Sequence, residues 1–307
     1  MIPKLLLFLT TTFIYGDLYD HLKKVEKQVC HSIRNVDFIY MINLDQRPEK
    51  WKQSIQQLIP YGITPCRFSA VNGWELSLEA INDVGLKFSP EMEGGIWGTS
   101  YLDESFEPRH GIIQNLGQTY FCHCMARGTI GIALSHISIL QDAFDSGYET
   151  IWVMEDDIEI QENPHLLSDL IDQLDDLVGR GNWDVLFTDR DIRDRQGAHI
   201  VSYHAAPRPD FLFYRQFNNF AEKTVCGNHF CKIGSRYGAH SMILRRSGII
   251  KLLTFFKAHQ IFLPYDMDYI LAPGINLYSL MIDVVTNLTH ALSDNGAPYY
   301  LDKQEDL

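Results

Sequence analysis

The feature that most constrains the fold of this chain is a repeated alternation of short apolar runs with amphipathic segments. Compact β-rich runs occur at "VDFIYMINLD" (residues 36–45), "TIWVMEDD" (150–157) and "WDVLFTD" (183–189). Alternating strands and helices favour an α/β fold with a mostly parallel sheet flanked by helices. In such a sheet, ligands bind in a crevice at the carboxyl ends of the strands.

Helical periodicity between these runs supports the same architecture. One helix is predicted from Pro48, which suits a first helical turn, to Gly62, with Trp51, Ile55, Leu58 and Ile59 on one face. Further helices are predicted from the spacing of apolar residues within 126–149, where Gly147 ends the helix, and within 163–179. A strand is expected around residues 64–73, and residues 237–259 are expected to form a strand followed by a helix, so strand and helix alternate along most of the chain.

Two segments break the alternation. Residues 74–124 are a mixture of Gly, Pro and polar residues, and we interpret them as an insertion with little regular structure. Residues 190–236 are irregular and aromatic. Without internal repeats or a flexible linker, the sequence predicts one domain over residues 36–307, preceded by a leader segment at residues 17–35 with a short helix.

The N-terminus, residues 1–16, has the pattern of a signal peptide or short membrane anchor. Lys4 precedes an apolar run from Leu5 to Ile14, and Gly16 follows it. If this signal operates, the protein is secretory, periplasmic or membrane-associated, and otherwise it is cytoplasmic. The alternative interpretation is an apolar segment packed against the domain.

The net charge of the chain limits the classes of ligand that it is expected to bind. The chain has 307 residues, with 39 acidic against 26 basic ones and a formal charge of −13. This charge repels phosphate backbones, and no basic run with interleaved aromatic residues is visible, so nucleic acid is not an expected partner. An acidic protein would bind a phosphorylated ligand most simply through a divalent cation.

The six cysteines leave three interpretations open. Four of them form two clusters, "CHC" at residues 122–124 and "CGNHFC" at 226–231, and each cluster contains a histidine. The clusters are compatible with disulfides, with free thiols, or with a shared zinc site, although the spacing matches no standard zinc module.

The acidic triplet Glu155, Asp156 and Asp157 ends a buried strand, where adjacent negative charges repel one another unless a cation lies among them. In an extended chain Glu155 and Asp157 point to one face, while Asp156 faces away or supports a loop. We therefore predict Asp157, with Glu155, as ligands of Mn²⁺ or Mg²⁺. The alternative is a solvated strand end before the next helix.

A second acidic pair, Asp266 and Asp268, lies in "PYDMDY". Either carboxylate can act as a general base, and one of them can instead complete the metal shell. The competing interpretation is that Asp266 caps a short helix. His136 is able to donate to a diphosphate, but a lone histidine on an apolar helix is more often a buried supporting residue. His240 is a weaker candidate.

Several motifs together resemble glycosyltransferase family 25, which includes lipooligosaccharide (lipopolysaccharide biosynthesis) and collagen galactosyltransferases. The motifs, in order, are "FIYMINLDQRPEKW", "RFSAVNG", "GTIGIALSHISIL", "VMEDDIEI", "WDVLFTD", "YGAHSMILRRSG" and "PYDMDY". The resemblance covers about residues 36–283 and implies a GT-A type nucleotide-binding sheet. It also implies an inverting, metal-dependent transfer of galactose from a UDP-sugar to a glycan or glycoprotein acceptor.

By the same resemblance, a set of polar residues is expected to contact the donor nucleotide: Asn43, Arg47, Asn72, Ser135, His136, Glu155 and Asp156. The chain departs from the family at Thr129 and Ile132, where Glu and Cys are common, and at Asn72, where the family has aspartate. These departures keep a catalytically silent nucleotide-sugar-binding protein as an alternative. A metal-dependent nucleotidyl- or phosphotransferase is the other alternative, although no Gly-rich phosphate loop is visible.

Overall fold

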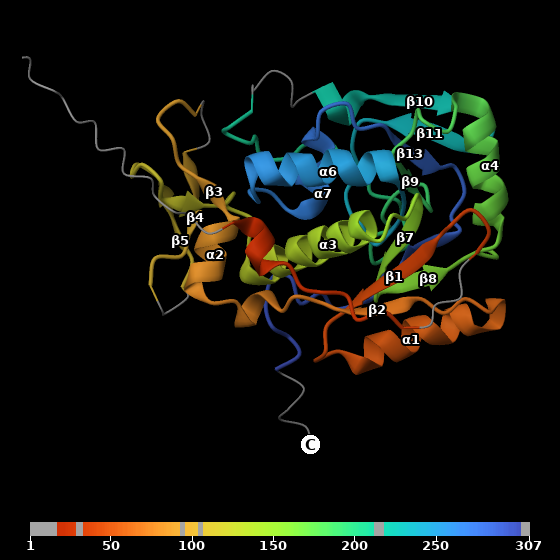
Figure 1. Ribbon diagram of the computed structural model, residues 1–307, viewed down its shortest axis with the longest axis horizontal. Helices are drawn as coiled ribbons and strands as arrows, with labels where there is room; N and C mark the ends of the chain where they lie inside the picture. Colours follow the sequence, from red (N-terminus) through yellow and green to blue (C-terminus); the bar gives the residue numbers. More distant parts are fainter. Residues whose placement is uncertain (1–16, 29–32, 93–95, 104–106, 212–217, 302–307) are drawn as a thin grey trace, which may run out of the picture.

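The computed structural model describes residues 17–28, 33–92, 96–103, 107–211 and 218–301. Its centre is an eight-stranded sheet with the order β10-β11-β13-β9-β12-β7-β1-β2 (Figure 1). The strands are β1 (Phe38–Asn43), β2 (Cys66–Ser69), β7 (Thr150–Glu155), β9 (Val185–Phe187), β10 (Lys223–Cys226), β11 (Phe230–Ile233), β12 (Ser241–Arg245) and β13 (Leu277–Leu280). Strands β2, β1, β7, β9 and β13 run in one direction, and β12 and β11 run against them. The predicted mostly parallel α/β fold is confirmed.

Helices cover both faces of this sheet. Successive side chains of each central strand point to opposite faces, so each face carries apolar side chains that a layer of helices buries. In β1, Tyr40 and Ile42 belong to one apolar core, and Ile39 and Met41 belong to the other. The first core is completed by α3 (Arg127–Asp145) and α6 (Arg246–His259), and the second by α4 (Leu166–Val178) with the end of α1 (Pro48–Leu58). All six residues of β1 are buried, as expected for a strand covered on both faces.

The predicted helices are present with small differences at their ends. Helix α1 begins at Pro48 and ends at Leu58, and the 3-10 turn η2 (Ile59–Tyr61) leads to Gly62 at φ 67°. Ile59, predicted on the apolar face, is 60% exposed because the chain has left the α-helical spacing at that point. Gly147 and Gly179 follow α3 and α4 with positive φ, as predicted helix ends.

The insertion at residues 74–124 contains more regular structure than predicted. It comprises η3 (Gly73–Glu75), α2 (Leu78–Val84), β3 (Leu86–Lys87), β4 (Trp97–Ser100), β5 (Arg109–Ile112) and β6 (Thr119–Tyr120). Strand β3 pairs with β6 and β4 pairs with β5, both antiparallel. Strands of two to four residues are too short to show a readable alternation, which explains why the sequence pattern did not reveal them.

The region 190–236 also differs from its irregular prediction. After the 3-10 turn η4 (Asn218–Ala221), strands β10 and β11 form an antiparallel hairpin at one edge of the central sheet. Residues 223–225 of β10 are exposed, so this edge strand has no apolar run to identify it. Two further strands, β8 (Ile158–Ile160) and β14 (Val285–Asn287), pair with each other outside the sheet.

In the described part of the leader segment, residues 17–28 and 33–35, the one helical element is the 3-10 turn η1 (Leu18–His21), and the predicted short helix is not found there. From this turn the described residues run over α3 and α6: the Tyr19 hydroxyl donates to the Leu253 carbonyl, and the Lys23 N–H donates to Ser138 Oγ. The predicted signal segment lies outside the described residues. Among the residues that are described, no helix is both long and apolar enough to cross a membrane.

Candidate functional site

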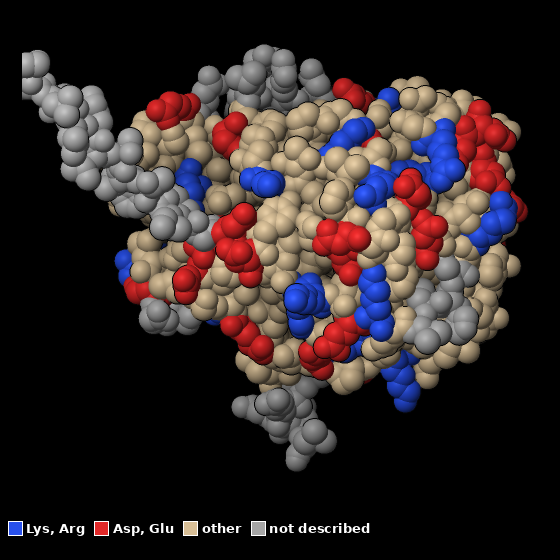
Figure 2. Space-filling view, in the orientation of Figure 1, with Lys and Arg blue, Asp and Glu red and all other residues tan. Residues whose placement is uncertain are grey.

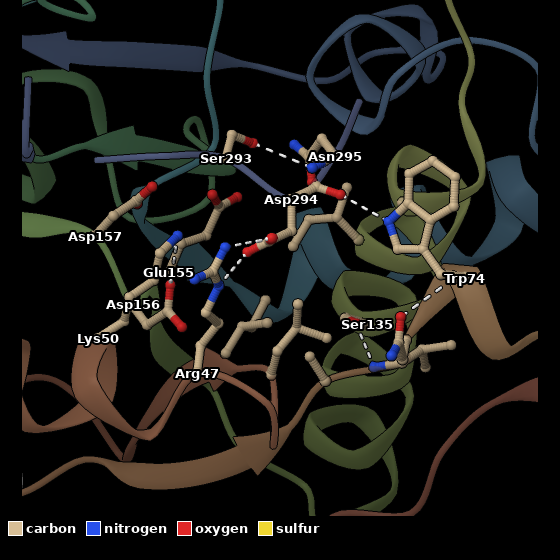
Figure 3. A pocket seen from close by; sticks show the side chains of 18 residues that line it. Arg47, Lys50, Trp74, Ser135, Glu155, Asp156, Asp157, Ser293, Asp294 and Asn295 are labelled. Atoms are coloured by element: carbon tan, nitrogen blue, oxygen red, sulfur yellow. Dashed lines mark hydrogen bonds and ion pairs between the residues drawn. The ribbon is translucent and has the colours of Figure 1, made fainter. Parts of the chain in front are cut away.

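A pocket lies where the carboxyl ends of β2, β1 and β7 meet. Ile42 of β1 pairs with Glu155 of β7, and Asn43 pairs with Ser69 of β2, so the three strands end at the same edge. The pocket is lined by the loops that follow these strands and by the start of α3 (Figure 3). Its position is the one that a parallel sheet predicts for a ligand site.

The acidic triplet forms one side of this pocket. Glu155 is the last residue of β7, and Asp156 and Asp157 follow in a bend. All three residues line the pocket, so the expectation that Asp156 faces away is wrong. The Asn43 side-chain amide holds Asp156 in place by donating to its carboxylate at 2.6 Å, and Lys50 Nζ lies 3.9 Å from Asp156 Oδ1.

Burial and mutual repulsion change the protonation of the triplet. Burial, together with the charge of Asp157, raises the pKa of Asp156 to about 7. Burial, together with the charge of Glu155, also raises the pKa of Asp157. Burial opposes ionisation of Glu155 too, but the hydrogen bond and charge of His136 outweigh it and hold the Glu155 pKa below its ordinary value. The pocket is therefore short of positive charge.

His136 lies behind the pocket, on α3. It is buried, its Nε2 is 3.1 Å from Glu155 Oε1, and its ring stacks on Tyr265 with centroids 4.2 Å apart. Because Glu155 is its polar partner, His136 orients that carboxylate and links it to α7 (Tyr265–Asp268). This placement matches the supporting role that a histidine on an apolar helix most often has.

Ser135 and Asn72 fix the loop after β2. Ser135 Oγ accepts the Val71 N–H at 2.8 Å and donates to the Gly131 carbonyl, which ties the loop to α3. Asn72 accepts the Trp74 N–H at 3.1 Å and so caps η3. Both residues line the pocket, and their side chains hold its wall in shape.

Arg47 lines the pocket but already has a carboxylate partner. Its guanidinium makes two hydrogen bonds of 2.6 Å to Asp294, and both side chains are almost completely buried. Figure 3 shows Arg47 near the acidic triplet, joined to Asp294 of the segment Ser293–Asn295. The Asp294 carbonyl also accepts the Trp74 indole N–H at 2.8 Å, so the C-terminal segment closes one side of the pocket.

Sequence reasoning did not identify Trp74 or the segment Ser293–Asn295 as pocket residues. "SDNG" has the composition of a turn, and no local pattern connects it with Arg47, which is 247 residues away. A buried arginine requires a counter-charge, but the burial of Arg47 is visible only in the structure, so no sequence signal identified Asp294.

His240 and Asp189 form a buried pair beside the triplet. Asp189 follows β9 and His240 precedes β12, so both lie at the pocket edge of the sheet. His240 Nε2 is 2.9 Å from Asp189 Oδ2, and Arg236 donates to the other Asp189 oxygen at 2.7 Å. His240 Nδ1 is buried and has no partner among the described residues, while its ring acts electrostatically on Asp157 and Glu155.

The two aspartates of the second acidic pair, Asp266 and Asp268, have different surroundings. Asp268 is fully buried and accepts from Arg208 at 2.6 Å and from the N–H groups of Phe262 and Leu263. Asp266 is half-buried and accepts the Gly238 N–H at 2.7 Å. The alternative that Asp266 caps a helix is wrong, because the N-cap of α7 is Pro264 and Asp266 lies inside the helix.

Five of the cysteines are described, and all five are free thiols: Cys66, Cys122, Cys124, Cys226 and Cys231. Within the part of the chain that the structure describes, no three His, Cys, Asp or Glu side chains come together as metal ligands. The two cysteine clusters therefore do not combine into the zinc site that the sequence left open. The same finding means that the three pocket carboxylates do not converge on one point.

Comparison with known proteins gives a family for most of the chain. Residues 36–270 match the model "Glycosyltransferase family 25 (LPS biosynthesis protein)". A "Glycosyltransferase 25 family member" of Aedes aegypti is 29% identical over 174 residues, which are 57% of this chain and 24% of the relative. The Drosophila melanogaster protein of the same name is 27% identical over 173 residues, 56% and 24% of the two chains.

The human "Inactive glycosyltransferase 25 family member 3" is 25% identical over 127 residues, 41% of this chain and 17% of the relative. The matched part of this chain thus spans a quarter or less of the length of these curated relatives.

Proposed function

Because this chain belongs to glycosyltransferase family 25, we propose that it transfers a hexose, galactose in the first instance, from a UDP-sugar to a hydroxyl of a glycan or glycoprotein acceptor, with inversion. The observation that carries this proposal is the set of three carboxylates at the end of β7, in a pocket where positive charge is scarce. A diphosphate and these carboxylates repel each other unless a divalent cation lies between them.

The residues present fit such a cation. Mg²⁺ is commonly held by one or two carboxylates, with substrate phosphates and water as its remaining ligands, so a cluster of three protein ligands is not needed. Asp157 and Glu155, which both line the pocket, would hold the cation. When bound, Mn²⁺ or Mg²⁺ supplies charge stabilisation for the departing diphosphate. Lys50, near Asp156, places a further positive charge at the same wall.

Asp266 has the better environment for the general base. Burial raises its pKa, with a smaller contribution from the charge of Glu155, and a pKa closer to the working pH favours proton transfer. Asp268 has both oxygens occupied by Arg208 and by backbone N–H groups. In the proposed reaction Asp266 accepts the proton of the acceptor hydroxyl, whose oxygen bonds to the anomeric carbon as the bond to the UDP oxygen breaks.

A catalytically silent nucleotide-sugar-binding protein is the second candidate. The human relative is named as inactive, and this chain has Ile132 in the pocket wall and Asn72 at the loop after β2, where the family has other residues. Such a protein would retain cation-dependent donor binding without turnover, so the two candidates predict different results for the same sample.

Asp157→Asn tests the proposal, with Asp176→Asn on the exposed side of α4 as the matched control. We expect the unaltered protein to bind UDP-galactose with Mn²⁺ in calorimetry and to hydrolyse or transfer the sugar. Asp157→Asn should lose both properties, because a metal ligand contributes to binding and turnover together. Asp176→Asn should retain both.

Normal turnover of Asp157→Asn would contradict the assignment of the metal ligand. Donor binding without any turnover in the unaltered protein would favour the silent alternative.

A further inference from the structure

A second cleft is lined in part by the loop that carries Asp266. It has a volume of about 580 Å³, and its walls come from the two segments that interrupt the α/β alternation. Trp97 and His123 belong to the insertion at residues 74–124, and His204 belongs to residues 190–236. Phe262 and Met267, at the two ends of the Asp266 loop, line the cleft as well. Segments far apart in the sequence therefore build one recess.

The walls of this cleft carry no formal charge when histidine is neutral. None of the described residues that line it is Asp, Glu, Lys or Arg, although the chain as a whole has a charge of −13. On the face shown in Figure 2, by contrast, Lys and Arg side chains lie among many Asp and Glu side chains. The donor pocket also differs from this cleft in charge, because carboxylates line the donor pocket. A wall without charge favours a ligand without charge, because an ion would lose its hydration without gaining a counter-charge.

Aromatic and imidazole groups shape the cleft. Trp97, at the start of β4, is 56% exposed. The Tyr237 hydroxyl donates to the His204 carbonyl at 2.8 Å, which holds that wall in place. His123 and His204 are exposed and offer ring nitrogens. Apolar ring faces beside polar atoms suit a ligand that is itself apolar on one face and hydroxylated at its edge, as a pyranose ring is.

The loop that carries the proposed base, Asp266, forms part of the cleft wall. Pro264 and Met267, on either side of Asp266 in the sequence, line the cleft, and Gly238, which donates to Asp266, follows the lining residue Tyr237. The charge of Glu155, in the donor pocket, adds to burial in raising the pKa of Asp266, and the charge of Asp266 acts on Cys124 of the cleft. Asp266 is thus electrostatically coupled to residues of both recesses.

We propose that this cleft is the acceptor subsite and that it binds an uncharged, hexose-containing oligosaccharide, with Trp97 stacking on a sugar ring. The inference rests on the proposed transferase function, because it takes Asp266 as the base. The proposed ligand is a neutral glycan. Preferred binding of a cationic peptide or an anionic glycan would therefore contradict the proposal.

Trp97→Ala tests the proposal, and Ile112→Ala is the matched control. Ile112 is the cross-strand partner of Trp97 in the β4–β5 ribbon and is 57% exposed, but it does not line the cleft. The probes are four neutral disaccharides, lactose, N-acetyllactosamine, maltose and cellobiose, with sialyllactose and a lysine-containing peptide as charged competitors. Binding is measured by calorimetry on the full chain with Mn²⁺ and UDP.

We expect at least one neutral disaccharide to bind more tightly than either charged probe. Trp97→Ala should weaken that binding about tenfold or more, because the apolar face of the sugar would lose the indole ring on which it packs. Ile112→Ala should bind as the unaltered protein does, and both variants should retain UDP binding and cooperative thermal unfolding.

Equal disaccharide affinity in Trp97→Ala and the unaltered protein would overturn the inference while leaving the proposed function intact. Tighter binding of a charged probe, or no binding of any neutral disaccharide, would also overturn it. Failure of the unaltered protein to bind UDP with Mn²⁺ would instead contradict the proposed function, and disaccharide binding is measured separately in that case.

Discussion

Two aspartates only two residues apart, Asp266 and Asp268, have different physical roles in this structure. Asp268 neutralises the buried Arg208 and accepts two backbone N–H groups, which is a structural role. Asp266 makes one backbone contact, and burial raises its pKa. The sequence could not separate them, because "YDMD" presents both as one acidic pair.

We expect Asp266→Asn to lower turnover about 10²- to 10⁴-fold, as loss of a general base does, with little change in donor affinity. Asp268→Asn should instead destabilise the fold, by up to about 3–5 kcal/mol, because the fully buried Arg208 would keep only one of its two carboxylate partners, Asp210. Steady-state kinetics and urea unfolding of both variants measure the two effects. The assignment is reversed if Asp268→Asn is inactive at normal stability while Asp266→Asn turns over normally.

For individual residues, the sequence predicted which side chains lie in the pocket better than it predicted which side chains they contact. It placed Glu155 and Asp157 at the end of a buried strand and Ser135 on a helix, and the structure brings all three into one pocket. It could not predict that Arg47 is paired with Asp294, because that contact depends on how a distant segment returns to the sheet.

At the scale of elements, the wall of the pocket depends on the close approach of α3 to the loop after β2. A Cβ at Gly131 would lie 2.5 Å from the Gly73 nitrogen and 2.5 Å from the Val71 oxygen, and both are backbone atoms. Only a residue without a side chain allows this approach. The hydrogen bond from the Val71 N–H to Ser135 then fixes the loop.

Gly131→Ala should therefore lower the free energy of unfolding by about 1–3 kcal/mol, as overpacking does, and weaken UDP binding by displacing the loop. The sign of the change in the free energy of unfolding is informative, because alanine in place of glycine would stabilise an unobstructed helix by roughly 1 kcal/mol. Gly111→Ala in β5 is the control, since no atom lies within 4 Å of its added Cβ. Urea unfolding and calorimetry provide the measurements, and a more stable Gly131→Ala would contradict the tight contact.

The elements that could be predicted are the long ones. Helices α1, α3, α4 and α6 have 11 to 19 residues and display several turns of apolar periodicity. Strands β3 and β6 have two residues each, and β10 is exposed along most of its length, so neither length nor hydrophobicity identifies them. Tertiary pairing, which the local sequence does not encode, creates these strands.

At the scale of the whole molecule, the family match ends at residue 270, but the folded domain continues beyond that residue. Strand β13 lies inside the central sheet between β9 and β11, and β14 pairs with β8. Beyond them, Asp294 supplies the partner of Arg47 in the donor pocket. The residues after 270 therefore complete both the sheet and the site.

A chain ending at residue 270 should for this reason not fold cooperatively. Loss of β13 breaks two strand ladders at once and leaves β9 and β11 with unpaired edges, which promote aggregation. A chain ending at residue 301 retains every contact described in the structure, and we expect it to match the full chain in thermal unfolding and in Mn²⁺-dependent UDP binding. Circular dichroism during heating and calorimetry compare the three proteins. Cooperative unfolding of the chain ending at residue 270, together with normal UDP binding, would show that the matched family region forms the sheet and the pocket without β13.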